Sequence, residues 1–122
     1  MMRLKQVGGF LIVALITGGG GASAQAAPVA GAAQTADKGA AVFAAQKCSL
    51  CHSLDGKGNA KGPLDDVGSK LTADEIRQWI VMPAEMGAKA KATRKPAMKA
   101  FPSLPKEDLD ALVAFLHARK KK

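Results

Sequence analysis

The chain has 122 residues, a length that suits one domain. Four Phe, one Trp and no Tyr are too few aromatic side chains for an ordinary core, so we expect a bound cofactor or a covalent staple to complete it. The formal charge of +8 favours an acidic partner surface or an anionic membrane face, whereas the basic segments lack the interleaved aromatic residues of a nucleic-acid-binding protein.

The first 24 residues resemble a signal peptide for export. A short positively charged segment precedes apolar residues 7–16, a run too short to cross a bilayer comfortably. Small residues at 22–24, or alternatively at 24–26, fit a cleavage site. We therefore expect a periplasmic bacterial protein, whose charge falls from +8 to +6 when Arg3 and Lys5 are removed; an uncleaved membrane anchor is the alternative.

Residues 25–34 are expected to form a linker, because they are rich in Ala, Gly and Pro and lack apolar periodicity. The folded domain would then span 35–122, with three helices and no convincing strand. The first helix is expected at about 36–46, with Thr35 as its N-cap. Gly39 within this helix would cost stability unless another element packs against it.

The second helix is expected at about 72–82. Thr72 and Glu75 match a capping box at its start, and Pro83 ends it. One face of this helix carries three apolar residues, Ile76, Trp79 and Ile80. We expect this face to pack into the core.

The third helix is expected at about 105–119, with Pro105 in its first turn. Its apolar stripe consists of Leu109, Leu112, Val113 and Leu116. The basic residues 119–122 are interpreted as a frayed, solvated helix end, with a docking patch as the alternative. Two long loops, at 53–70 and 84–103, separate the helices, and wrapping a planar cofactor would explain their length.

Residues Cys48-Ser49-Leu50-Cys51-His52 form the C-x-x-C-H pattern of covalent haem attachment. Two thiols one helical turn apart can form thioethers with the two vinyl groups of the porphyrin, and the adjacent His then lies under the iron. A zinc site would need a second pair of ligands and a thioredoxin-like redox motif would need a βαβ setting, and the chain shows neither. A structural disulfide would leave His52 unexplained.

From about Thr35 to Lys120 the chain resembles the class I cytochrome c family. The resemblance rests on a helix with Gly39 and Phe43, the Cys48 to His52 motif, Gly62-Pro63, a helix ended by Pro83, a Met loop, and a terminal helix with Leu112, Phe115 and Leu116. It implies an all-α fold with three main helices and long loops that wrap one covalent haem c.

The resemblance also implies roles for individual residues. Gly39 would let the terminal helix cross closely, with Phe43 and Phe115 at the contact. Pro63 would mark the loop whose carbonyl accepts a hydrogen bond from Nδ1–H of His52. Trp79 would pack on the haem edge and donate its indole N–H to a propionate.

Four residues are candidates for the second iron ligand: Met82, Met86, Met98 and His117. We favour Met98, because the segment 95–101 before the terminal helix resembles the Met loop of the family, although Lys99 stands where many members have Pro. Met82, which is followed by Pro83, and the loop residue Met86 remain alternatives. His117 points about 100° away from the apolar stripe of its helix and is not expected to be a ligand.

A haem with both axial positions filled has no open iron site, so we expect a soluble, monomeric one-electron carrier rather than an enzyme. The alternatives are a sensor or small-ligand-binding cytochrome with a labile Met, and a cytochrome subunit of a larger oxidoreductase. Membrane contact would come only through partner complexes or an uncleaved signal. Acidic redox partners would be steered by lysines around the haem edge, such as Lys47, Lys57, Lys61, Lys89, Lys91 and Lys99.

Overall fold

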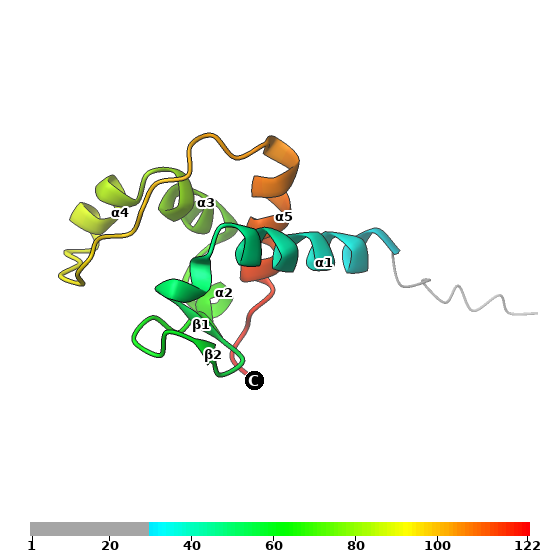
Figure 1. The fold of residues 1–122 in the computed structure, drawn as a ribbon, viewed down its shortest axis with the longest axis horizontal. Helices are drawn as coiled ribbons and strands as arrows, with labels where there is room; N and C mark the ends of the chain where they lie inside the picture. The colour runs from blue at the N-terminus through cyan, green and yellow to red at the C-terminus, as the bar shows by residue number, and fades with distance from the viewer. Residues whose placement is uncertain (1–29) are drawn as a thin grey trace, which may run out of the picture.

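The structure is a computed structural model that describes residues 30–122. The expected signal peptide and the first five residues of the expected linker lie outside this part of the chain. The elements in chain order are α1 (Ala30–Ala45), the 3-10 turn η1 (Cys48–Leu50), β1 (Ser53–Leu54), β2 (Lys57–Gly58), α2 (Val67–Lys70), α3 (Ala73–Val81), α4 (Pro83–Lys89) and α5 (Lys106–His117) (Figure 1). The all-α prediction is confirmed, since the two strands form only a short antiparallel hairpin.

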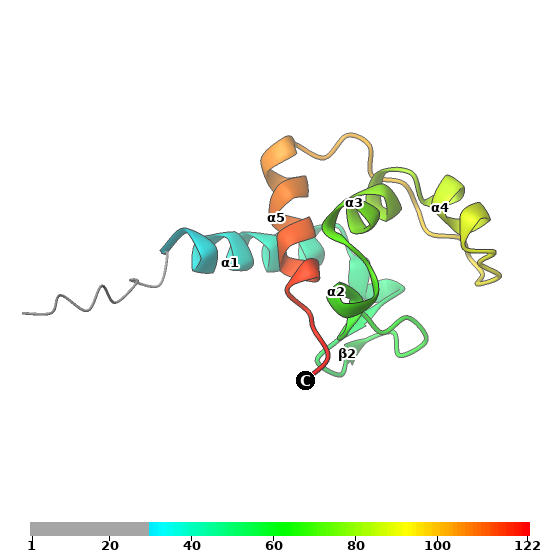
Figure 2. The same ribbon diagram turned by 180° about the vertical axis from the view of Figure 1, so that it is seen from behind.

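The centre of the fold is the crossing of α1 and α5, which both ribbon views show (Figures 1 and 2). A Cβ built at Gly39 would collide with Cβ of Phe115 and with the carbonyl oxygen of Ala111, so only glycine allows this approach. The Phe43 and Phe115 rings meet at the crossing with centroids 6.2 Å apart and planes tilted by 56°. The expected contact between the two helices is therefore present.

The first helix begins earlier than we expected. Residues 30–34, which we had interpreted as linker, are the first residues of α1. Thr35 is not an N-cap, because its Oγ1 lies inside the helix and donates to the Gly31 carbonyl at 2.7 Å. Alanine is the strongest helix former, and the Ala-rich segment extends the helix beyond the crossing, with residues 31–34 exposed.

The second helix follows its prediction closely. Thr72 Oγ1 accepts from the Glu75 N–H at 3.2 Å, and the Glu75 carboxylate accepts from the Thr72 N–H at 2.8 Å, which completes the capping box. Ile76 and Ile80 are each 3% exposed and pack into the same core as Leu112 of α5. Local capping and apolar spacing therefore place α3 against α5.

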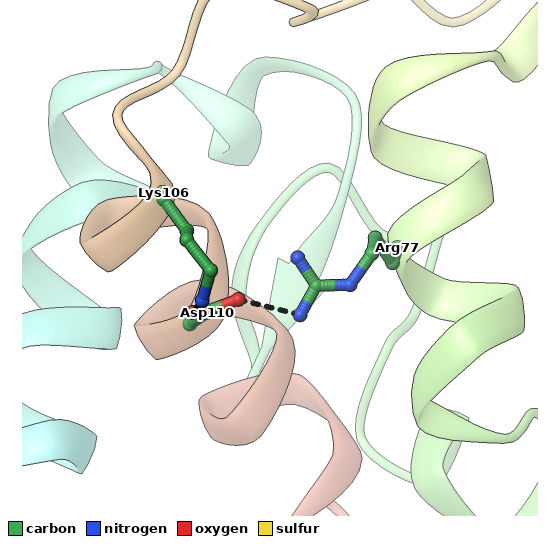
Figure 3. Close-up of polar contacts among 3 residues, drawn as sticks. All are labelled: Arg77, Lys106 and Asp110. Carbon is green, nitrogen blue, oxygen red and sulfur yellow. Dashed lines mark hydrogen bonds and ion pairs between the residues drawn. The ribbon is translucent and has the colours of Figure 1, made fainter.

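An ion-pair network also joins α3 to α5 (Figure 3). Asp110 accepts from Arg77 at 2.6 Å across the helix interface and pairs with Lys106 one turn earlier on α5. The hydrogen bond from Lys106, followed by that from Arg77, lowers the pKa of Asp110 and keeps its carboxylate charged. The groups are solvent-exposed, so the network contributes little to stability.

The two expected loops contain short regular elements that we did not predict. The segment 53–70 holds the hairpin and α2, and the segment 84–103 begins with α4. Pro83 ends α3 as expected, but it also occupies the first position of α4, where its missing N–H costs nothing. The residues the structure describes include no helix long and apolar enough to cross a membrane.

The basic residues that follow α5 contact other elements of the fold. Arg119 pairs with Asp55 of the hairpin turn at 2.9 Å, and its carbonyl accepts from the Gly68 N–H at 2.8 Å. The Lys120 ammonium donates to the Gly68 carbonyl, and the Lys121 N–H donates to Ser69 Oγ at 2.7 Å. Residues 120–122 are exposed to solvent as interpreted, but residues 119–121 also contact α2 and the hairpin, partners that no local pattern reveals.

Candidate functional site

A cavity of about 540 Å³ lies between α3, α4, α5, the turn η1 and the segment before α5. Its lining is mostly apolar, with Phe43, Leu64 and Ile80 among its walls. Its volume falls within the ~300–1,000 Å³ that is usual for cofactor sites. The core is therefore incomplete without a large apolar ligand, as the scarcity of aromatic residues predicted.

The C-x-x-C-H segment forms one wall of this cavity as a single turn. Lys47, two residues after the end of α1, is in the left-handed region with φ 56°, and η1 follows directly. The Cys51 N–H donates to the Cys48 carbonyl at 3.1 Å, and the His52 N–H donates to the same oxygen at 2.9 Å. Both thiols are free, and both cysteines line the cavity together with His52. The turn therefore presents two thiols and one imidazole to one space.

The imidazole of His52 is held by the neighbouring loop. Its Nδ1 lies 3.1 Å from the Gly62 carbonyl oxygen, so Nδ1–H donates to that carbonyl. Burial lowers the pKa of His52 most; the Gly62 bond opposes this effect, while the Arg94 charge adds to it. The ring is therefore neutral with its proton on Nδ1, which leaves the Nε2 lone pair free for a metal.

The acceptor is Gly62 rather than the adjacent Pro63, which we had named for this loop. A Cβ at Gly62 would collide with the Cys51 carbonyl and with the Arg94 guanidinium, so the peptide approaches His52 closely only as glycine. Pro63 itself forms an isolated parallel bridge with Ser53. The sequence therefore indicated the correct loop, and the packing determined which carbonyl in it accepts from His52.

Met98 is half-buried and lines the cavity with Cys48, Cys51 and His52. Among the methionines of residues 30–122, neither Met82 nor Met86 belongs to the lining: Met82 is 41% exposed, and Met86 is buried elsewhere on α4. His117 also lies outside the lining, with Nε2 3.2 Å from Nζ of Lys120. The fold thus brings together the sulfur and the imidazole that we favoured as ligands.

Trp79 and Arg94 are further polar groups of the lining. Trp79 is half-buried on α3, and its indole N–H makes no hydrogen bond to another residue in the range 30–122. Arg94 donates through Nη2 to the Cys51 carbonyl. Our sequence reasoning did not predict this contact of Arg94, because only the fold brings its segment against the cysteine turn.

These residues fit a covalently bound haem. The walls are apolar, the two thiols share one helical turn, and a neutral imidazole and a thioether face the same cavity. Burial raises the pKa of the Cys48 thiol above its usual range. The described residues contain no group of three or more His, Cys, Asp or Glu side chains that could hold another metal ion.

Comparison with known proteins agrees with this site. The family model described as Cytochrome c matches residues 36–120. Among curated proteins, the chain is 28% identical over 94 residues to "Cytochrome c oxidase subunit 2" from Alkalihalophilus pseudofirmus (strain ATCC BAA-2126 / JCM 17055 / OF4). That match covers 70% of this chain but only 26% of the relative. No solved structure matches the chain at a significant level.

Proposed function

The chain belongs to the cytochrome c family, which binds haem c covalently, and we propose on that basis that it is a soluble, monomeric one-electron carrier with His52 and Met98 as iron ligands. Cys48 and Cys51 would hold the haem through thioethers. The observation that carries the proposal is that Met98 lines the same cavity as the cysteine turn and His52, whereas the other methionines of residues 30–122 do not.

Each residue has a distinct task in this proposal. Bound haem supplies a centre that gains or loses one electron. The Gly62 carbonyl keeps the His52 ring oriented and its Nε2 unprotonated. Met98 contributes a neutral thioether, which favours the ferrous state relative to a second nitrogen ligand. The apolar walls exclude water and disfavour the more highly charged ferric form. Trp79 lines the cavity, and in this proposal its indole N–H would donate to a propionate.

We expect Met98→Ala to abolish the weak far-red absorption band that a bond between Met sulfur and ferric iron produces. The reduction potential should fall at the same time, because the soft neutral ligand is lost. Absorption spectra and redox titration of the purified holoprotein measure both changes.

Met82→Ala and Met86→Ala are the matched controls, since neither residue lines the cavity. Both variants should keep the band. A band that survives in Met98→Ala, or that disappears in one of the controls instead, would contradict the proposed ligand.

We propose that the partners are acidic redox proteins, because exposed basic residues line part of the cavity. Lys91 and Lys95 lie in its lining and are exposed, and Lys99 follows Met98. The remaining lysines that we expected to steer a partner are also exposed, namely Lys47, Lys57, Lys61 and Lys89. Opposite charges accelerate encounter and are screened by salt.

Electron transfer to an acidic blue-copper protein should therefore slow as ionic strength rises. Lys91→Gln should lower the second-order rate at low salt by roughly twofold or more, since each removed charge weakens steering. Lys122→Gln at the C-terminus is the control and should leave the rate almost unchanged. Stopped-flow mixing measures these rates, and equal effects of the two variants would argue against docking at the cavity.

The oxidase-subunit relative favours a second candidate, in which the domain works within a larger oxidoreductase. Sedimentation of the protein from its native membrane or periplasmic fraction separates this candidate from a free carrier.

We further propose that the protein is periplasmic, as is typical of bacterial cytochrome c domains, and that cleavage follows residue 24. N-terminal sequencing of the mature protein tests that cleavage.

A further inference from the structure

The guanidinium of Arg94 joins the two chain segments that carry the proposed iron ligands. Arg94 lies four residues before Met98. Its Nη2 donates to the carbonyl oxygen of Cys51, the residue that precedes His52, although the two are 43 positions apart in sequence. The hydrogen bond therefore ties the Met98 side of the cavity to the His52 side.

The same guanidinium packs against the loop that orients His52. A Cβ at Gly62 would collide with Nη1 of Arg94, so the missing side chain of Gly62 makes room for the guanidinium. The Gly62 carbonyl accepts from Nδ1–H of His52. Arg94 thus contacts both the turn that precedes the imidazole and the peptide that holds the ring.

Comparison with the next residue, Lys95, shows that the contact of Arg94 does not follow from its positive charge alone. Lys95 also lines the cavity and carries the same charge, but its side chain makes no hydrogen bond within residues 30–122. Arg94 likewise takes part in no ion pair in that range. Both residues are cations in the cavity lining, but only Arg94 joins one chain segment to another through a hydrogen bond.

We infer that Arg94 is a positioning residue that fastens the Met98 segment to the Cys51–His52 turn and so limits how often Met98 leaves the iron. The inference rests on the proposed His52 and Met98 ligation. The segment 92–105 has no helix or strand of its own. Its later part is held by packing of Met98, Phe101 and Leu104 on the core and by the Phe101 N–H, which donates to the Ile80 carbonyl at 2.9 Å. The charge-assisted hydrogen bond of Arg94 adds a tie at its earlier part. A planar guanidinium can donate to one peptide while it packs against another, which an ammonium does less well.

Titration of the ferric holoprotein with imidazole tests this role. Imidazole competes with the Met98 sulfur for the iron, so its apparent affinity rises with the fraction of molecules in which Met98 is detached. We expect Arg94→Gln to bind imidazole roughly three- to tenfold more tightly than the wild type, as the loss of one charge-assisted hydrogen bond implies. Lys95→Gln should stay within about twofold, and Arg94→Lys should fall between these values.

Absence of the far-red band in the wild-type protein would overturn the proposed Met ligation itself. If the wild type shows the band, equal affinities for Arg94→Gln and wild type, or equal shifts for Arg94→Gln and Lys95→Gln, would overturn the role of Arg94. If circular dichroism shows that Arg94→Gln has lost its helices, the Arg94→Lys variant replaces it in the test. Tighter imidazole binding by Arg94→Lys than by Lys95→Gln would support the positioning role of Arg94, and equal binding would refute it.

Discussion

Gly39→Ala is expected to lower the free energy of unfolding by about 1–3 kcal/mol, the usual cost of overpacking a tight contact. The added Cβ would collide with Cβ of Phe115 and with the Ala111 carbonyl, and the latter is backbone that cannot rotate away. Helix propensity by itself would favour Ala by about 1 kcal/mol. A net loss of stability would therefore come from the collision at the crossing of α1 and α5.

Gly31→Ala is the matched control on the same helix. No atom lies within 4 Å of a Cβ built at Gly31, which precedes the crossing. This variant should be as stable as the wild type or more stable by up to about 1 kcal/mol, because helix propensity favours Ala and no clash opposes it. Denaturant unfolding followed by circular dichroism compares the two variants, and equal stabilities would contradict the crossing geometry.

The second large effect is expected from the Cys48→Ser and Cys51→Ser double variant, which should lose all covalently attached haem. A hydroxyl does not replace the thiol in thioether formation, so both links to the porphyrin disappear. Without the cofactor the apolar cavity of about 540 Å³ would be left unfilled, and the chain should lose helical signal as well as colour. Acid–acetone extraction followed by an absorption spectrum measures the haem that remains on the polypeptide.

Leu50→Ala is the control for that experiment. Leu50 lies between the two cysteines on the same turn and is 69% exposed, so its truncation should leave attachment intact. Each single Cys variant should retain one thioether, which the pyridine haemochrome spectrum distinguishes from two. Non-extractable haem in the double variant would show that attachment does not depend on this turn.

Local patterns predicted the parts of the fold whose causes are close in sequence. The capping box of Thr72 and Glu75, the apolar stripe of the terminal helix and the C-x-x-C-H turn each depend on residues within one to three helical turns. Even so, α4 was missed, because Pro83 looked only like a stop for the preceding helix. The start of α1 was missed because alanine and glycine in succession resemble a linker.

The sequence by itself therefore determined the helical class of this protein, its haem-attachment turn and the helix faces that pack together. Only the tertiary structure decided that Met98 rather than Met82 or Met86 lines the cavity, that Gly62 accepts from His52, and that Arg94 reaches Cys51. Arg119 and Asp55, which are 64 positions apart, illustrate the reason. Such contacts depend on how whole elements pack, and no short window of sequence contains both partners.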